Sequence, residues 1–344
     1  MKFFRARTAL YAGLHLSVDG LCAVAVFSRL YAVTDSGIPL FVFIAYNAVA
    51  FVLQPLFGRI VDRTGHDRFW LRVSLLVVAA SAAIALPVPL AAVSLGLGNG
   101  LFHVAGGKYV LARSKGRSAP AGVFVASGAT GLAVGTFFPT TTVALGFLLV
   151  MGLCLLASEL LPRDEAPAPA APLPRIGARE TVWIVLLLAT AFLRALLGKA
   201  APTDWADGPA VLVAIAVSAS LGKAAGGFVA DRIGIRPTAL VSVGLAVLLY
   251  GFFPGWTATF IAATFAFNMT MPLTLALVNR RYPGREAFGF GLVAATLFPG
   301  YVLGLLVLEG NAPFSATLLL CAVPAAVVLA CDPRRKEALT HAGA

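Results

Sequence analysis

Long apolar stretches, each about 20 residues in length, recur along this chain and alternate with short arginine-rich loops. A stretch of this length spans a membrane as a helix, because in hydrocarbon its backbone groups must find partners within their own segment. The composition agrees, since 59% of the 344 residues are hydrophobic and 12% are charged. Strands of a membrane barrel would appear as short alternating segments instead. The pattern predicts an all-α polytopic membrane protein.

We expect twelve transmembrane helices in two pseudo-symmetric halves of six. The segments expected in the first half are 9–31, 38–58, 69–87, 89–111, 119–138 and 140–161. Those expected in the second half are 181–200, 208–228, 238–254, 256–279, 287–308 and 313–331. A stretch rich in proline and alanine between them is predicted to be an extended linker. The predicted divisions are an N-terminal half (1–161), a cytoplasmic linker (162–180) and a C-terminal half (181–344).

Basic residues produce a formal net charge of +11, and they cluster in loops between apolar segments. This placement leaves no room for a soluble nucleic-acid-binding surface, so we expect no nucleic-acid partner. The basic loops follow every second segment, while the alternate loops are acidic or neutral. By the positive-inside rule the basic loops, the linker and both termini are predicted to be cytoplasmic, in a multi-pass protein of the cell (inner) membrane.

One loop motif occurs twice, as GRIVDRTG at 58–65 and GFVADRIG at 227–234, with an offset of 169 residues. Each copy follows the second segment of its half. Internal repeats of this kind mark secondary transporters, whose halves move about a site near the middle of the membrane.

The repeated motif, the six-plus-six layout and the central linker resemble the major facilitator superfamily of transporters. Within it, HLSVDG (15–20), GLFHV (100–104) and GVFVASGATGLAVG (122–135) are most similar to the fosmidomycin-resistance type of exporter. Val104 replaces a proline common in that type, and Gly128–Ala129 replaces the Gly–Pro pair of drug antiporters.

The superfamily resemblance implies alternating access, with the Asp and Arg of each motif forming charge contacts at helix ends. These contacts latch the outward-open state in the family, and a carboxylate is physically suited to a helix N-terminus. The residues predicted to form this latch are Gly58, Asp62, Arg63, Gly65, Gly227, Asp231, Arg232 and Gly234.

Asp19 lies near the middle of the first segment, where an isolated charge costs about 2.5–3.5 kcal/mol. His15 is one helical turn earlier on the same face. A low-dielectric environment favours the protonated form of a carboxylate, as a reversible proton carrier requires. We therefore predict that Asp19 and His15 couple transport to protons. The alternative is a neutral aspartate that satisfies a polar group on a neighbouring helix.

The stretch GLGNGLFHVAGGKYV (96–110) is not a phosphate-binding P-loop, because the glycine and the Ser/Thr that flank Gly–Lys in that motif are missing. On a helix, Asn99 and His103 share one face. His103 either contacts substrate or makes an interhelical hydrogen bond. Lys108 is expected to extend toward the cytoplasmic interface.

Arg194 lies near the middle of the seventh segment, and Lys223 in the eighth is the repeat counterpart of Gln54 in the second. With the two histidines these cations favour a carboxylate or phosphate ligand. The alternative for Arg194 is an ion pair with Asp19. The predicted substrate-binding residues are Arg194, His103, Asn99, Lys223 and Gln54.

The four cysteines have no paired spacing, so we predict no metal, no cofactor and no disulfide framework. The sequence has neither clustered metal ligands nor a nucleophile constellation, and we predict that the protein is not an enzyme. Since no ATP-binding segment occurs, an ion gradient must drive it. We predict a monomeric, proton-coupled exporter of a small organic anion or drug-like compound. The alternatives are a symporter or facilitator for uptake, and a membrane receptor or scaffold.

Overall fold

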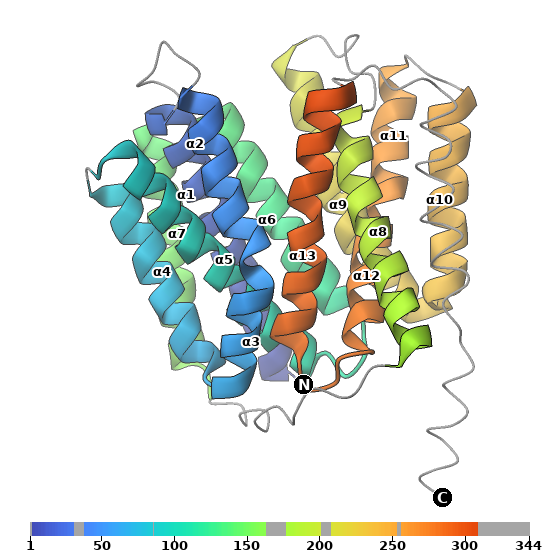
Figure 1. The fold of residues 1–344 in the computed structure, drawn as a ribbon, viewed down its shortest axis with the longest axis horizontal. Helices are drawn as coiled ribbons and strands as arrows, with labels where there is room; N and C mark the ends of the chain where they lie inside the picture. Colours follow the sequence, from blue (N-terminus) through green and yellow to red (C-terminus); the bar gives the residue numbers. More distant parts are fainter. Residues whose placement is uncertain are drawn as a thin grey trace, which may run out of the picture.

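The computed structural model describes residues 2–30, 38–84, 86–162, 177–200, 208–252 and 256–308. Every regular element in these ranges is helical, which confirms the predicted all-α class (Figure 1). The helices are α1 (Lys2–Val24), α2 (Ile38–Asn47), α3 (Gln54–Thr64), α4 (Asp67–Ala83), α5 (Val88–Arg113), α6 (Ala119–Phe137), α7 (Thr141–Leu160), α8 (Ala178–Ala200), α9 (Pro209–Ile233), α10 (Ile235–Phe252), α11 (Thr257–Asn268), α12 (Thr270–Asn279) and α13 (Glu286–Leu303). Short π-helical turns follow α1, α2 and α13, at Ala25–Leu30, Ala48–Val52 and Gly304–Leu308.

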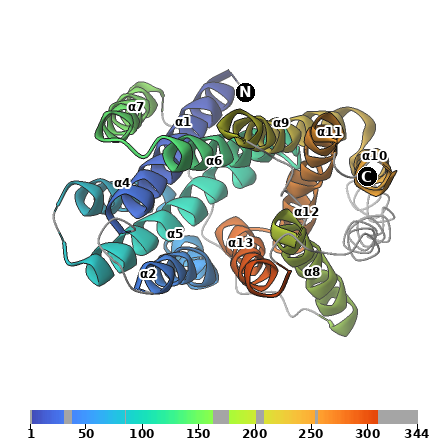
Figure 2. The ribbon, with the colours of Figure 1, turned by 90° about the horizontal axis from the view of Figure 1, so that it is seen from above.

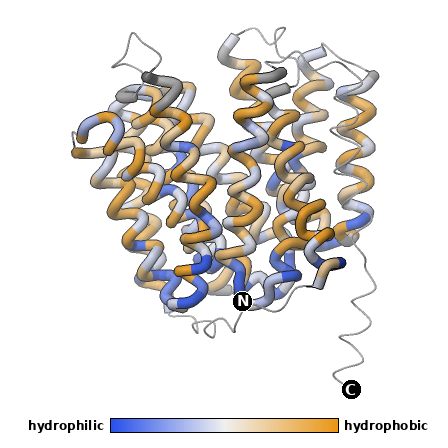
Figure 3. Tube along the Cα trace, in the orientation of Figure 1, coloured by the Kyte–Doolittle hydropathy of each residue, from blue (hydrophilic) through white to orange (hydrophobic). Residues whose placement is uncertain are grey.

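Within the described ranges, nine continuous helical segments are long and apolar enough to cross a membrane. The helices α4 and α10 occupy two further predicted segments, 69–87 and 238–254. The predicted twelfth segment, 313–331, and most of the predicted linker lie outside the described residues. Hydrophilic residues gather at the end of the bundle that holds the N-terminus, and apolar residues dominate the helices above it (Figure 3).

Proline and glycine account for several helix boundaries. A break separates α11 from α12 because Pro272 has no N–H to donate to the carbonyl of Asn268, four residues earlier. The motif helices α3 and α9 both end at a glycine with positive φ, 68° at Gly65 and 94° at Gly234. Glycine adopts this conformation without the steric cost that other residues meet, which explains its place in both copies.

Seen from above, the helices form two groups, which we call the N-terminal bundle (α1–α7) and the C-terminal bundle (α8–α13) (Figure 2). In the first, α1 packs against α6 and α7, and α4 packs against α5. In the second, α9 packs against α11 and α13 packs against α8. The bundles meet where α6 packs against α9 and α3 packs against α13. The exact boundaries of the two halves stay a prediction.

The motif glycines allow these two inter-bundle contacts. A Cβ atom on Gly58 would collide with the backbone of Ala287 at the start of α13. A Cβ atom on Gly227 would collide in the same way with the backbone of Ala119 at the start of α6. Small residues let helix backbones approach closely in membranes, so both copies of the motif serve the same packing purpose.

A second glycine pair has the same 169-residue offset and lies one turn further along each partner helix. Gly122 of α6 faces the backbone carbonyl of Lys223, and Gly291 of α13 faces the backbone of Gln54. The two interfaces between the bundles are therefore pseudo-symmetric copies of each other.

Candidate functional site

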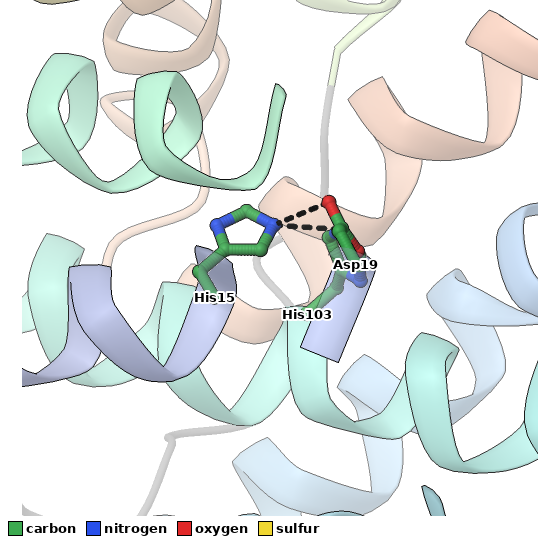
Figure 4. Close-up of side chains that lie close together, drawn as sticks. All are labelled: His15, Asp19 and His103. Atoms are coloured by element: carbon green, nitrogen blue, oxygen red, sulfur yellow. Dashed lines mark hydrogen bonds and ion pairs between the residues drawn. The ribbon is translucent and has the colours of Figure 1, made fainter. Parts of the chain in front are cut away.

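Three titratable side chains from α1 and α5 meet inside the N-terminal bundle (Figure 4). His15 Nε2 lies 3.2 Å from Asp19 Oδ2 and 2.9 Å from His103 Nε2. His103 Nε2 lies 3.6 Å from Asp19 Oδ1. We call these three residues the triad. The packing of α5 against α1 thus places the predicted proton-coupling pair beside a histidine predicted to bind substrate.

In each triad histidine the other ring nitrogen, Nδ1, forms a hydrogen bond with a backbone carbonyl. His15 Nδ1 donates to the carbonyl of Phe124 at 2.7 Å, and His103 Nδ1 donates to the carbonyl of Asn99 at 2.9 Å. A carbonyl only accepts hydrogen bonds, so both Nδ1 atoms carry hydrogen. Neutral rings in this tautomer would place two Nε2 lone pairs face to face, which is repulsive. A proton between the two rings removes the repulsion and gives a Nε2–H donor beside the Asp19 carboxylate.

Asn99 orients the carboxylate of the triad. Its Nδ2 donates to Asp19 Oδ1 at 3.2 Å and to the Tyr46 hydroxyl at 2.8 Å. The Asp19 side chain is 15% exposed, against 3% for His15 and 8% for His103. The carboxylate is therefore the most exposed member of the triad.

Aromatic rings surround the histidines, and one of them comes from the other bundle. The Phe124 ring centre lies 4.3 Å from that of His15, and the Phe51 ring lies 6.0 Å from His103. The ring centre of Phe290 in α13 lies 6.2 Å from that of His103. A Cβ atom on Gly107 of α5 would collide with the Phe290 ring. The triad is thus in direct contact with the inter-bundle interface, in apolar surroundings that strengthen charge interactions.

Asp62 of the first motif copy reaches across the interface to the N-terminus of α13. Its carboxylate accepts hydrogen bonds from the backbone N–H groups of Ala287 at 3.2 Å and Phe288 at 2.8 Å. Such a helix end carries partial positive charge, which favours the carboxylate. Lys108 Nζ lies 3.2 Å from Asp62 Oδ1 and donates to the Val61 carbonyl at 3.1 Å.

The prediction that Lys108 extends to the membrane interface is wrong. Only 2% of this residue is exposed. The physical reason is the fully buried Asp62 carboxylate, which offers the ammonium group an ion pair inside the protein.

Asp231 of the second copy makes the reciprocal contact with the N-terminus of α6. It accepts hydrogen bonds from the backbone N–H groups of Ser118 at 2.6 Å and Ala119 at 3.1 Å. Asp231 is exposed, and the position equivalent to Lys108 in the second half is Leu277. The two carboxylates therefore join the bundles in opposite directions, one buried with a lysine and one at the surface without it.

The motif arginines do not take part in these contacts. The side chains of Arg63 and Arg232 are exposed, and neither makes a hydrogen bond or ion pair with another described residue. Each lies in the last turn of its helix, where the partial negative charge of the helix end favours a cation. The aspartates and glycines of the motif, rather than its arginines, bridge the bundles.

The predicted substrate cations of the C-terminal bundle make no hydrogen bond or ion pair with the triad among the described residues, but Lys223 is near enough to Asp19 and Arg194 for their charges to interact. Arg194 is 6% exposed, its Nη1 donates to Thr270 Oγ1 at 3.4 Å, and its buried Nη2 has no partner among the described residues. Arg194 makes no ion pair with Asp19, contrary to the alternative that the sequence left open. Lys223 is half-buried and has no hydrogen bond or ion pair with another described residue. Gln54 is fully buried, and its Nε2 donates to the Ala50 carbonyl at 2.9 Å.

The sequence did not identify several residues of this region. Tyr46 and Phe290 gave no sequence signal, because aromatic residues are common in apolar helices. Gly122 and Gly291 share the offset of the motif and could have been found from it. The convergence of His15, Asp19 and His103 as one possible ligand set also went unpredicted.

No protein-family model and no curated protein matches the chain. Solved structures do match over nearly its whole length. The E. coli fucose:proton symporter FucP is 11% identical with a TM-score of 0.69, covering 96% of this chain and 98% of that one. The human organic anion transporter MFSD10 is 18% identical with a TM-score of 0.67, covering 94% and 99%. A bacterial homologue of the iron transporter ferroportin, in an outward-facing state, is 14% identical with a TM-score of 0.62, covering 95% and 97%. The chain has the fold of the major facilitator superfamily.

Proposed function

We propose that this protein is a proton-coupled secondary transporter that works by alternating access. Its fold is that of membrane transporters, and its two bundles meet through pseudo-symmetric contacts of the kind that rocking halves make and break. The triad supplies a site for the coupling proton. Substrate binding is assigned to both bundles, through Asn99 and His103 on one side and Arg194, Lys223 and Gln54 on the other.

The shared-nitrogen geometry of His15 and His103 carries the proposal of proton coupling. Both Nδ1 atoms donate to carbonyls while the Nε2 atoms lie 2.9 Å apart, so the site favours one bound proton. With Asp19 ionised beside a protonated pair, the triad is neutral overall, which suits apolar surroundings. Asp19, as the most exposed member, takes up the proton and releases it as the bundles move.

The substrate is a small organic anion. Arg194 supports this proposal because its guanidinium is buried with an unpartnered Nη2 atom, and because no acidic residue pairs with it among the described residues. A guanidinium group binds carboxylate or phosphonate through two parallel hydrogen bonds. Lys223 adds a second positive charge on the same bundle. The fold neighbour MFSD10 is itself described as an organic anion transporter.

The aspartates of the two motif copies latch one conformation. Asp62 and Asp231 each hold the first turn of a helix in the opposite bundle, at the end that holds the N-terminus. Closing this end while the other end opens corresponds to an outward-facing state, if the basic loops are cytoplasmic. The latch then releases when the bundles rock to the inward-facing state.

We assign the protein to the cell (inner) membrane as a monomer with both termini in the cytoplasm. Export follows from the resemblance to the fosmidomycin-resistance type. Uptake by symport or facilitated diffusion uses the same triad and cations with the opposite direction of flow. A receptor or scaffold would need neither the proton site nor the buried arginine.

Reconstitution into liposomes tests the proposal. A thermal-shift screen of carboxylates, phosphonates and cations of similar size first identifies a ligand. Vesicles that contain a pH-sensitive dye then report whether that ligand moves protons. We expect an anion to stabilise the protein and to drive proton movement across the membrane. Anion flux without proton movement would indicate a facilitator, and binding without flux would indicate a receptor.

A further inference from the structure

We propose that the triad also binds a divalent first-row transition metal ion. The ligand atoms would be Nε2 of His15, Nε2 of His103 and a carboxylate oxygen of Asp19. These atoms form the only group of three or more candidate ligands from His, Cys, Asp or Glu among the described residues. The chemistry of two imidazoles and one carboxylate matches sites for zinc, iron, cobalt and nickel, whereas magnesium and calcium prefer oxygen ligands.

The separations of these atoms fit one ion. Ligands about 2.1 Å from a metal lie about 3.0 Å apart at a right angle and about 3.4 Å apart at the tetrahedral angle. The triad separations are 2.9, 3.2 and 3.6 Å. Little movement is therefore required for the three side chains to bind an ion between them.

The second coordination shell is already in place. Metal-binding histidines donate their other ring N–H to a carbonyl or carboxylate, which fixes the tautomer and the ring orientation. Both triad histidines do this, to the carbonyls of Phe124 and Asn99. The Asn99 side chain also holds the Asp19 carboxylate. These contacts leave Nε2 of each ring as the nitrogen that can bind metal, which it does in its unprotonated form.

The backbone of Gly128 in α6 packs directly against two of the ligand atoms. A Cβ atom at this position would collide with Nε2 of His15 and Oδ2 of Asp19. Three protein ligands do not complete the shell of such an ion, so water would supply the remaining ligands. Gly128 therefore provides a substitution that blocks the ion without removing a ligand.

The ligand nitrogens are the same atoms to which the proposed function assigns the proton. The site assignment rests on the ligand geometry and stands apart from transport. A protein that binds metal at the triad without moving protons contradicts only the proposed coupling. A protein that couples protons but leaves metal unbound contradicts only this inference.

Titration of the purified, tag-free protein with Co²⁺ tests the inference, because bound cobalt shows visible absorption bands. We expect one saturable site per chain. His103→Gln and Gly128→Ala should each weaken binding at least tenfold, and His66→Ala, which changes an exposed histidine far from the triad in sequence, should leave it unchanged.

Thermal unfolding of each variant in the absence of metal separates loss of ligand from loss of fold. The wild-type titration decides by itself if the variants unfold. Absence of a saturable cobalt site in the wild-type protein overturns the inference, as does unchanged binding in folded His103→Gln and Gly128→Ala proteins.

Discussion

The Nε2 atoms of His15 and His103 lie 2.9 Å apart, although the Nδ1 atom of each ring already donates to a backbone carbonyl. This relationship joins α1 to α5 and brings the side chains of the triad together. His103 lies on α5, and the next turn of this helix holds Gly107 and Lys108. Gly107 packs against Phe290, and Lys108 pairs with Asp62. Helix α5 therefore connects the triad with the Asp62 contact between the bundles.

The tautomers of the two rings can be measured directly. We predict that both Nδ1 atoms carry hydrogen and that the Nε2 atoms share one proton, because the carbonyls of Phe124 and Asn99 only accept. NMR of protein labelled with ¹⁵N-histidine distinguishes protonated from unprotonated ring nitrogens. His66→Gln assigns the signal of an exposed control histidine. An unprotonated Nδ1 in either triad ring at neutral pH contradicts the geometry.

Removing the buried latch charge should open the end that holds the N-terminus. Asp62→Asn leaves Lys108 charged and without its ion pair, which typically costs about 3–5 kcal/mol for a buried pair. We expect slower turnover with substrate affinity unchanged within a few-fold, because Asp62 does not contact the predicted substrate residues. Asp231→Asn should have a smaller effect, because that carboxylate is exposed. Transport by Asp62→Asn at the wild-type rate would show that the contact is not a latch.

The double variant Asp62→Asn with Lys108→Met tests the source of that effect. Removal of both charges should restore part of what the single change loses, since no unpaired charge stays buried. Strictly additive losses would indicate that the hydrogen bonds to α13, and not the ion pair, stabilise the contact.

The motif glycines make a separate prediction. Gly58→Ala and Gly227→Ala should each separate the bundles at this end, because the added methyl group collides with the backbone of the opposing helix. Spin labels at exposed positions 66 and 236, one on each bundle, report the separation as a distance distribution. Gly152→Ala in α7 is the matched control, since nothing lies near its Cβ position. In that control alanine should favour the helix by about 0.5–1 kcal/mol. Equal distributions in all variants would exclude steric control by the motif glycines.

Arg194 should determine the charge preference of the substrate. Arg194→Gln is expected to weaken an anionic ligand by about 2–5 kcal/mol if the guanidinium is a buried direct partner. Arg194→Lys should recover only part of this, because the two-pronged donor geometry is lost. Isothermal titration of the screened anion measures both. Arg72→Gln is the control, since Arg72 pairs with Glu159 at the surface. Unchanged affinity in Arg194→Gln would make Arg194 structural.

Sequence periodicity was sufficient for the helical fold, because apolar length alone decides which segments cross a membrane. The repeated motif also singled out Asp62 and Asp231 as a matched pair. The partners of these carboxylates could not be predicted, because sequence can indicate where a helix starts but not which helix start of the other bundle faces each aspartate. Lys108 was misplaced for a related reason: hydropathy places a lysine near a helix end at the interface, and only packing reveals a buried partner.

The triad, too, could be predicted only in part from the sequence. His15 and Asp19 were linked by their spacing on one helix. Their approach to His103 depends on how α1 and α5 pack, and sequence periodicity does not specify which faces of two apolar helices meet. The metal-ligand geometry arises only from that packing.

Gradient-driven transport by Asp19→Asn in liposomes tests the central claim most directly. The variant imitates a permanently protonated carboxylate, so it can neither load nor release the coupling proton. With the anion found by the thermal-shift screen, the wild-type protein should accumulate ligand in response to a pH gradient. Asp19→Asn should lose this accumulation completely while it still exchanges labelled for unlabelled ligand. Accumulation by Asp19→Asn against a concentration gradient, with unchanged pH dependence, would contradict the proposal that the coupling proton enters and leaves the triad through Asp19.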